Sequence, residues 1–231
     1  MKTITMTLFN RPQYTKRVID CLSCCENIQK YHLLIFIDPG SEEVVSLANN
    51  INFTSKEIVV NKRRLGCDTN IYTAINTGFS RSDYNIHIED DVCPGKDMLK
   101  YFEFCDYRYK YDSTVLTICA YHKTRNEEER QQYCYDKVFR NPWFTPWGWA
   151  TWKDRWDEIK GMWSFGGGWD VHLHNVIRGN RFEIRPYLAR SQNIGEQAGT
   201  HVSPNAFWRD HYNEFWVNSS DCNSIENFIE I

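Results

Sequence analysis

Short β-branched segments alternate with amphipathic helical segments through the first half of the chain, and this alternation constrains the fold most strongly. Apolar, β-branched runs predict strands at residues 3–9, 33–37, 57–60, 84–88 and 114–118. Helical spacing predicts one helix that begins at Pro12 and three more at residues 42–50, 68–79 and 96–109. Asp68 is the expected N-cap of the helix at residues 68–79. This order predicts an α/β fold with a mainly parallel, Rossmann-like sheet and helices on both faces.

The second half of the chain has a different composition, so we expect a change of substructure near residue 115. Residues 141–169 are dense in Trp, Gly and Pro, and the tail from residue 206 is polar and aromatic without a strong period. Residues 127–129 and the arginines around them are expected to form a solvated loop or helix face. The chain shows no low-complexity linker, so we expect two subdomains, residues 1–115 and 116–231, within one unit.

The chain is rich in aromatic residues, with 9 Trp, 13 Tyr and 13 Phe among 231 residues. Part of this set must fill the core, but Trp and Tyr also form platforms for sugars and nucleobases. The net charge of -3 argues mildly against a protein that coats nucleic acid, although a local basic patch is compatible with it.

Nine cysteines form an odd set whose spacing shows no secreted disulfide framework, so we expect reduced thiols in a reducing compartment. The segment MKTITMTLFNRP is interpreted as a strand rather than as a signal peptide. No apolar run reaches the ~18 residues that a membrane span requires. We therefore expect a cytoplasmic protein without a transmembrane segment.

Unusual polar residues directly follow four of the predicted strands. Asn10 and Arg11 follow the first strand, Asp38 the second, residues 62–64 (KRR) the third and residues 89–91 (EDD) the fourth. The carboxyl ends of parallel strands form one edge of a sheet, where α/β proteins bind ligands. Arginines can hold a diphosphate, and paired carboxylates can hold Mg²⁺ or Mn²⁺. The pattern predicts a nucleoside-diphosphate site.

Each of these features has a commoner explanation when it stands alone. A single Asp after a strand is usually a turn residue or a helix cap, and short charged runs usually face solvent. Together these residues favour a binding site, because all of them are expected at the same edge of the sheet. The sequence contains no P-loop and no Gly-rich dinucleotide fingerprint, which leaves an ATPase or a dehydrogenase without support.

Five segments carry recognisable motifs: TLFNRPQYTKRVIDCL, RRLGCDTNIYTAINTGF, IEDDVCPGKDMLKYFEFC, WGWATWKDRW and NIGEQAGTH. In this order they resemble motifs of GT-A-fold glycosyltransferases. The nearest set is the bacterial family-2-like enzymes, and the Golgi N-acetylglucosaminyltransferase that starts hybrid N-glycans is more distantly similar. The resemblance covers about residues 3–204. It implies a GT-A fold in which residues 1–115 bind the nucleotide sugar and residues 116–231 form a fused acceptor-binding subdomain.

The resemblance also implies a donor-binding set at matching positions. Asp38 would pair with the uracil edge. Residues Glu89, Asp90 and Asp91 match a DxD-like motif, in which Asp91 binds Mn²⁺ or Mg²⁺ and Asp90 contacts ribose or a metal-bound water. His201 is either a further ligand of the metal or diphosphate, or a plain loop residue. The other positions expected near the nucleotide, the diphosphate or the donor sugar are Asn10, Arg11, Arg63, Arg64, Asn70, Trp147 and Gly148.

An inverting transfer requires a carboxylate that takes the proton of the acceptor hydroxyl, and Asp170 is the expected base. It follows the WGWATW segment, as the base-bearing segment of the family does. Three rival carboxylates are expected to decorate a helix instead: Asp154, Asp157 and Glu158. The tryptophans of WGWATW can also simply build a hydrophobic wall. The expected acceptor-binding residues are Trp149, Trp169 and Arg181.

The expected function is a metal-dependent, inverting transfer of a sugar from a UDP-sugar to a hydroxyl acceptor, with a cell-surface glycan as the first candidate. The main alternative is a phage-type DNA glycosyltransferase that acts on 5-hydroxymethylpyrimidine bases such as 5-hydroxymethylcytosine. It would use a groove formed by the arginines between residues 178 and 190. A protein or small-molecule acceptor, and a non-catalytic sugar- or nucleotide-binding module, stay open. The sugar and the oligomeric state also stay open.

Overall fold

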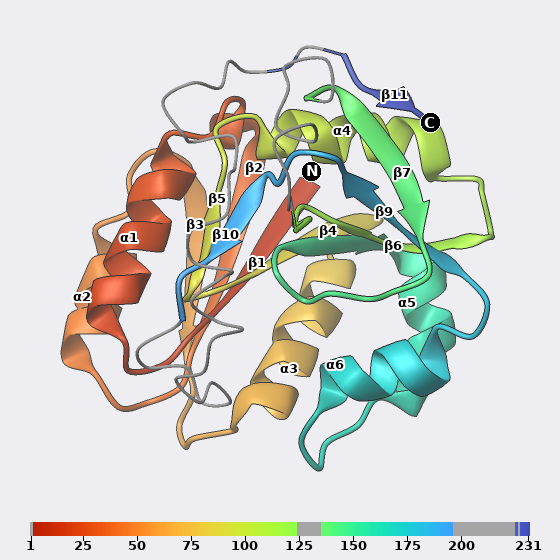
Figure 1. Cartoon of the computed structure of the whole chain (residues 1–231). Coiled ribbons are helices and arrows are strands. Elements are labelled where there is room, and N and C mark those ends of the chain that lie inside the picture. Colours follow the sequence, from red (N-terminus) through yellow and green to blue (C-terminus); the bar gives the residue numbers. More distant parts are fainter. Residues whose placement is uncertain (1, 124–134, 196–224, 226) are drawn as a thin grey trace.

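The predicted alternation of strands and helices is present in the computed structural model, which describes residues 2–123, 135–195, 225 and 227–231 (Figure 1). Every strand and helix predicted in the first half forms within a few residues of its expected bounds. The strands are β1 (Lys2–Leu8), β2 (Tyr31–Ile37), β3 (Ser55–Val60), β4 (Tyr84–Glu89) and β6 (Val115–Cys119). The helices are α1 (Pro12–Ser23), α2 (Glu42–Asn49), α3 (Cys67–Phe79) and α4 (Met98–Tyr109), and a 3-10 turn, Ile28–Lys30, precedes β2.

The structure adds short elements that the sequence pattern does not predict. The strands are β5 (Val92–Pro94), β7 (Lys137–Asn141), β8 (Trp149–Trp152), β9 (Phe182–Pro186), β10 (Ser191–Asn193) and β11 (Ile229–Glu230). The helices are α5 (Lys153–Ile159), a 3-10 turn Lys160–Met162, α6 (Trp169–His172) and a π-helical turn, Leu173–Ile177. These strands have five residues or fewer, which is too short for a hydrophobic period to stand out in the sequence.

Nine strands form one mostly parallel sheet flanked by helices, as predicted. Their order is β11-β7-β9-β6-β8-β4-β1-β2-β3, and β5 and β10 form a separate antiparallel pair. The neighbours β4, β1, β2 and β3 all pair in parallel. The strand β8 runs antiparallel between β4 and β6, so strands from both sides of residue 115 share this sheet. The two-subdomain division at that residue stays a prediction.

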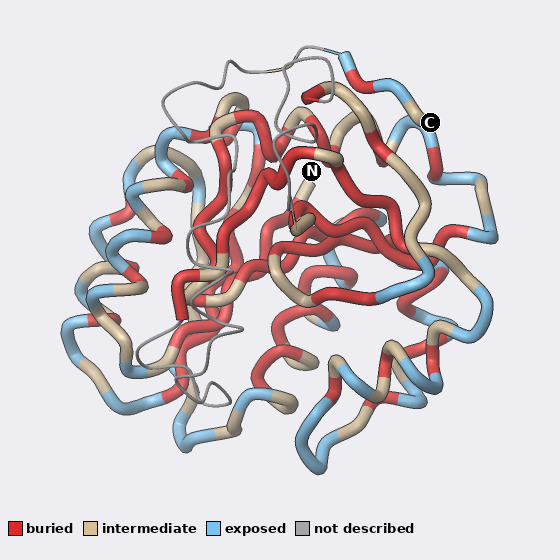
Figure 2. The backbone as a smooth tube through the Cα atoms, viewed as in Figure 1, coloured by how far each residue is buried: buried red, intermediate tan, exposed pale blue. Residues whose placement is uncertain are grey.

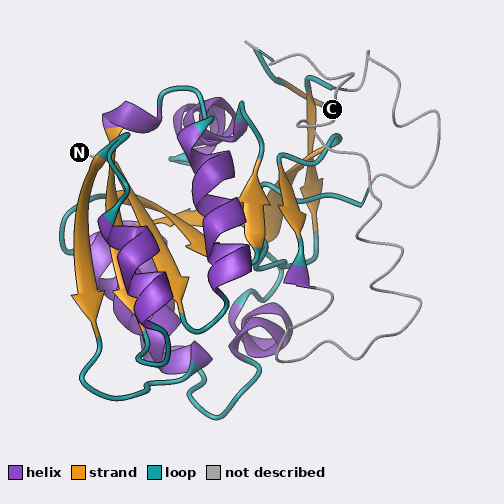
Figure 3. Ribbon diagram, turned by 90° about the vertical axis from the view of Figure 1, so that its left-hand side faces the viewer, coloured by secondary structure: helices purple, strands orange, loops and turns teal. Residues whose placement is uncertain are grey.

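Helices cover both faces of the sheet, which explains why its central strands are almost entirely buried (Figure 2). Along β1, Ile4 and Met6 enter the apolar cluster shared with α1, α2 and α4. Thr5, which points to the opposite face, lies beside Gly78 of α3. The helices α5 and α6 join α3 through a second cluster. The views in Figures 1 and 3 show these two helical layers.

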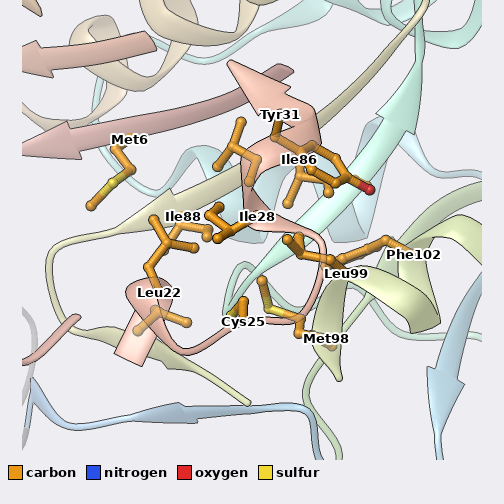
Figure 4. Packing of buried hydrophobic residues seen from close by; sticks show 14 of the residues in the cluster. Met6, Leu22, Cys25, Ile28, Tyr31, Ile86, Ile88, Met98, Leu99 and Phe102 are labelled. Carbon is orange, nitrogen blue, oxygen red and sulfur yellow. The ribbon is translucent and has the colours of Figure 1, made fainter. Parts of the chain in front are cut away.

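The first cluster fixes the strand that carries the acidic run (Figure 4). Its members from β4 are Tyr84, Ile86 and Ile88, and the side chains of the two isoleucines are fully buried. Burial of each large apolar side chain contributes roughly 1.5–3 kcal/mol. The cluster therefore holds the end of β4, and residues 89–91 with it, in a defined place. The other labelled members are Met6, Leu22, Cys25, Ile28, Tyr31, Met98, Leu99 and Phe102.

The second cluster is aromatic and anchors α6, which is too short to be stable alone. The ring of Trp169 stacks on Trp163 with centroids 4.8 Å apart and on Trp149 with centroids 5.9 Å apart. The ring of Phe144 packs edge-on against Trp169 at 5.8 Å. These contacts hold Trp169, and they also fix its neighbour Asp170.

The N-terminus of α3 differs from the prediction. The helix begins at Cys67, and its N-cap is Gly66 with φ at 81°, a conformation that glycine adopts without strain. Asp68 lies in the first turn rather than at the cap, and its Oδ2 accepts a hydrogen bond from the backbone N–H of Gly167 at 2.5 Å. Asp68 thus ties α3 to the loop before α6.

Seven cysteines in the described part of the chain are free thiols. The other two, Cys134 and Cys222, lie outside the described residues, as do residues 127–129 and the polar tail up to residue 224. Within the described residues, no helix combines the length and the apolar character that crossing a membrane requires.

Candidate functional site

The polar residues that follow β1, β2, β3 and β4 meet at one edge of the sheet, as predicted. These four strands are adjacent and parallel, so their carboxyl ends point the same way. The guanidinium of Arg64, after β3, lies over the ring of Phe9, after β1, at 4.3 Å. Asn10, Arg63 and Arg64 are exposed at this edge.

Arg11 bridges the two aspartates that follow β4. Its Nη1 donates to Oδ2 of Asp91 at 2.8 Å, its Nε donates to Oδ2 of Asp90 at 3.2 Å, and its Nη2 forms an ion pair with Asp90. Burial lowers the pKa of Arg11, but the charges of Asp91 and Asp90 outweigh this effect and raise the pKa overall. The chain thus places a cation of its own against the predicted metal ligand.

Negative charge is crowded at the end of β4. Burial, followed by the nearby charge of Asp91, raises the pKa of Asp90 to about 6, although Arg11 opposes this shift. Burial and the charges of Asp91 and Asp90 raise the pKa of Glu89 well above its usual value. Crowded, partly desolvated carboxylates favour any cation that approaches them.

The backbone around Asp91 is held by the small antiparallel sheet. The N–H of Ile194 donates to the carbonyl oxygen of Asp91 at 2.8 Å, next to the pairing of β5 with β10. A Cβ on Gly195 would lie 2.7 Å from Oδ2 of Asp91. The NIG segment therefore brings a bare backbone against the carboxylate, which explains the glycine. Sequence reasoning noted this segment but missed its contact with Asp91.

The residues present fit a divalent cation that is bound together with a diphosphate. Magnesium and similar cations often use one or two carboxylates and take their other ligands from substrate phosphates and water. Asp91, with Asp90 beside it, supplies such oxygens. Within the described residues, no group of three or more His, Cys, Asp or Glu side chains converges as a metal cage. His201, the predicted further ligand, lies outside the described residues.

Asp38 holds the basic loop after β3 in place. Its carboxylate accepts hydrogen bonds from the backbone N–H groups of Leu65, at 3.0 Å, and Gly66, at 2.8 Å, and from the side chain of Asn61 at 2.8 Å. Asn70 is buried, donates to the carbonyl of Phe36 and accepts from Asn61. The structure therefore gives Asp38 and Asn70 a role in shaping the loop that carries Arg63 and Arg64.

Asp170, the predicted base, comes from a segment of the chain far from the acidic run in sequence. It lies in the first turn of α6 and is half-buried. Its charge contributes to the raised pKa values of Glu89 and Cys67, so all three groups lie within electrostatic reach of one another. The structure thus places the predicted base within electrostatic reach of Glu89, the first residue of the predicted metal-binding run, although the two are far apart in sequence.

The three rival carboxylates lie on the outer face of α5, as predicted. Asp157 forms ion pairs with Lys153 and Lys160, while Asp154 and Glu158 are exposed and paired with arginines.

The WGWATW segment forms a wall whose rings are mostly turned inward. Gly148 has φ at 77°, and its carbonyl accepts from the N–H of Ala120 at 2.8 Å. Trp147 is half-buried against Tyr121, with ring centroids 4.6 Å apart. Trp149 and Trp169 are only 1% and 4% exposed. Their burial does not support the predicted contact with an acceptor, and their packing assigns them a structural role.

The arginines expected to line a DNA groove are engaged within the protein. Arg181 pairs with Glu158 at 3.0 Å and also donates to backbone carbonyls. Arg185 is buried against Glu183 at 2.9 Å, and Arg190 is fully buried with Asp97. These side chains do not form a basic groove. The position of Arg181 does not support the predicted contact with an acceptor, because its guanidinium already bonds to groups of the protein.

Sequence comparison identifies relatives of the chain. A sequence model described as the GNT-I family matches residues 10–226. An Arabidopsis thaliana alpha-1,3-mannosyl-glycoprotein 2-beta-N-acetylglucosaminyltransferase is 27% identical over 119 residues, which make up 50% of this chain and 26% of that protein. The chain therefore spans about a quarter of the length of this relative.

Solved structures with the same fold include glycosyltransferases. TarS from S. aureus in complex with UDP-GlcNAc has a TM-score of 0.61 and 12% identity, over 91% of this chain and 64% of that one. The mannosyltransferase PcManGT from Pyrobaculum calidifontis, in complex with GDP-Man and Mn²⁺, has a TM-score of 0.57 and 15% identity, over 80% of this chain and 54% of that one. These likenesses show the GT-A fold that the motifs implied. Because the family model matches nearly the whole chain, the chain belongs to the GNT-I family.

Proposed function

We propose that the chain is a metal-dependent glycosyltransferase that moves a sugar from a UDP-sugar to an acceptor hydroxyl, with inversion at the anomeric carbon. The observation that carries this proposal is the convergence of Arg11, Asp90 and Asp91 at the ends of β1 and β4, with Asp170 within electrostatic reach of Glu89 in the same acidic run. The Arabidopsis relative is an N-acetylglucosaminyltransferase, and the TarS neighbour was solved with UDP-GlcNAc. UDP-GlcNAc is therefore the first donor to test.

The donor diphosphate would bind at the carboxyl ends of β1 and β4. A divalent cation bound there with the donor would neutralise the charge that develops on the departing diphosphate. Asp91 supplies an oxygen for that cation, and the guanidinium of Arg11 beside it can bind phosphate oxygens. Arg63 and Arg64 are exposed on the neighbouring loop that Asp38 holds in shape.

The acceptor hydroxyl would approach from the side of α6. Asp170 would take its proton as the acceptor oxygen forms a bond to the anomeric carbon and the diphosphate oxygen leaves from the opposite face. The packing of Trp169 against Trp163 and Trp149 keeps Asp170 in place, and such rigidity favours reaction because the base is oriented in advance.

An uncharged glycan is the acceptor that the site supports best. A DNA acceptor would require exposed cations for its phosphates, whereas Arg181, Arg185 and Arg190 are paired within the protein. This pairing is the reason to test glycans first.

The test is release of UDP from UDP-GlcNAc, UDP-glucose and UDP-galactose, with Mn²⁺ or with a chelator, in the presence of glycans or of duplex DNA carrying 5-hydroxymethylcytosine. We expect Mn²⁺-dependent release that glycans stimulate and that Asp91→Ala abolishes. The matched control is Asp154→Ala, an exposed aspartate on α5, which should behave like the unaltered protein. Stimulation by DNA instead of glycans would contradict the acceptor class. Absence of Mn²⁺-dependent release from every donor would contradict the function.

A further inference from the structure

One aromatic ring near the site is turned outward. Trp143, in the segment between β7 and β8, is 57% exposed, whereas Trp149 and Trp169 are buried. Phe144 follows it directly and packs against both buried tryptophans, at 5.2 Å and 5.8 Å between ring centroids. Trp143 therefore stands at the outer rim of the aromatic cluster that anchors α6.

The ring of Trp143 is braced from behind by His174. Their centroids are 4.0 Å apart with an interplanar angle of 34°. The Nδ1 atom of His174 accepts a hydrogen bond from the backbone N–H of Phe144 at 3.2 Å, which fixes the orientation of the imidazole. The backbone carbonyl of Trp143 in turn accepts from the buried guanidinium of Arg185 at 3.1 Å. The exposed indole is thus held at its backbone and at one face.

The bracing histidine also connects this ring to the proposed base. His174 follows Asp170 by four positions in one continuous helical segment, so the two side chains lie on the same side of it, one turn apart. Burial lowers the pKa of His174, and the positive charges of Arg178 and Arg185 lower it further. This shift disfavours the charged form of the bracing imidazole.

An uncharged, partly apolar ligand suits this ring better than a nucleic acid. A flat indole offers apolar area and a polarised face, which suits the C–H face of a sugar ring. A stacked nucleobase would bring phosphates, and the arginines near Trp143 are already engaged: Arg185 pairs with Glu183, and Arg178 donates to the carbonyl of Arg181.

We propose that the exposed face of Trp143, braced by His174, is the platform on which a carbohydrate acceptor stacks before transfer. This inference rests on the proposed glycosyltransferase function and names the acceptor class and a specificity-determining residue for it. The platform lies about one helical turn from Asp170, because the bracing His174 follows Asp170 by four positions.

The experiment measures binding of methyl glycosides of mannose, glucose, galactose and N-acetylglucosamine to the protein saturated with UDP and Mn²⁺, by saturation-transfer NMR. The variants are Trp143→Ala, Trp143→Phe and His174→Ala. The control is Tyr111→Ala, which removes an aromatic ring that is 92% exposed at the end of α4. Affinity for UDP is measured in parallel for each variant, which separates loss of the platform from loss of the donor site.

We expect at least one glycoside to bind the unaltered protein and the Tyr111→Ala variant. Trp143→Ala should weaken that binding about tenfold, which corresponds to about 1.4 kcal/mol, while Trp143→Phe should retain part of it because it keeps an aromatic ring. His174→Ala should weaken it less, and UDP affinity should stay unchanged in all variants.

Two results would overturn the platform. One is glycoside binding that Trp143→Ala leaves unchanged, or no glycoside binding at all, in a protein that still binds UDP. The other is a Trp143-dependent affinity for a single-stranded oligonucleotide carrying 5-hydroxymethylcytosine instead of for glycosides. Failure of UDP to bind to the unaltered protein would instead overturn the proposed function, on which this inference rests.

Discussion

Gly195 and Arg11 show how single residues prepare the carboxylate of Asp91. A side chain on Gly195 has no room, because its Cβ would lie 2.7 Å from Oδ2 of Asp91. Arg11 occupies the same oxygen from the other side, at 2.8 Å from its Nη1. The ion pair with Arg11 therefore holds this carboxylate, and the absence of a side chain on Gly195 leaves room for it.

We predict that Gly195→Ala lowers the affinity for Mn²⁺ and UDP by roughly tenfold or more while the fold persists, because the added Cβ would displace the carboxylate of Asp91 and a shifted metal ligand typically costs this much. Titration calorimetry checks the affinities and circular dichroism the fold. Gly161→Ala is the matched control, because no atom lies within 4 Å of the added Cβ. Equal affinities in the two variants would show that the added Cβ does not displace the carboxylate of Asp91.

Arg11→Gln should raise the affinity of the donor-free protein for Mn²⁺ by about tenfold, because it removes a cation that competes for Asp91 and Asp90. The same change should weaken binding of UDP. Electron paramagnetic resonance of free Mn²⁺ measures the first effect and calorimetry the second. Lys16→Gln on the same helix, at an exposed pair with Asp20, is the control. A fall in donor-free Mn²⁺ affinity would mean that Arg11 does not compete with the cation.

Close approach of α3 to the sheet sets the position of the loops around the site. A Cβ on Gly78 would lie 2.6 Å from Oδ1 of Asn85 and 2.9 Å from the methyl group of Thr5. The buried hydroxyl and amide groups of this contact bond to one another: Oγ1 of Thr3 donates to Asn85, and Asn85 donates to Thr5. The glycine lets a polar strand face pack directly beneath a helix.

Gly78→Ala should lower the free energy of unfolding by about 1–3 kcal/mol, because the overpacking outweighs the helix propensity that alanine gains. Urea denaturation measures the change. The neighbouring Thr77→Ala should have a smaller effect, since the hydroxyl of Thr77 donates to the carbonyl of Thr73 in its own helix. A more stable Gly78→Ala variant would show that the helix can move outward without cost.

The longer elements of the first half were predictable because each has a hydrophobic period that repeats several times, as in α1 and β2. The edge on which Asp38, Arg11 and Asp91 meet followed from the parallel order of those strands. Two-to-five-residue strands such as β8 and β10 have no such signal, since their pairing depends on distant partners. Sequence could not show that Trp149 turns inward while Trp143 turns outward, because that choice depends on how β8 pairs.

At the scale of the whole molecule, one buried imidazole couples folding to pH. His87 of β4 is 1% exposed, and burial lowers its pKa to about 3. The unfolded chain protonates a histidine near pH 6.5. Below that pH the unfolded state binds one more proton than the folded state, so this residue makes the folded state less stable as the pH falls toward 3. Buried carboxylates with raised pKa values, such as Glu183, act in the opposite direction.

His87→Gln should isolate this contribution. The difference in unfolding free energy between the unaltered protein and the variant should change by about 1.4 kcal/mol per pH unit between pH 6 and pH 4, with the unaltered protein losing more. Urea denaturation at several pH values measures how the unfolding free energy of each protein changes with pH. The contributions of the buried carboxylates cancel in the difference, because both proteins contain the same carboxylates. Parallel slopes would show that His87 is protonated in the folded state or hydrated there.

The assignment on which the proposed function depends most is that of Asp170, on α6, as the base for transfer from a donor bound at Asp91. Its most direct test is to measure, for Asp170→Asn, the affinity for UDP-GlcNAc with Mn²⁺ by calorimetry and the turnover of the same protein. We expect the affinity of Asp170→Asn for UDP-GlcNAc to stay within about twofold of that of the unaltered protein. Its turnover should fall by roughly 100-fold or more. Turnover near that of the unaltered protein would contradict the assignment of Asp170 as the base.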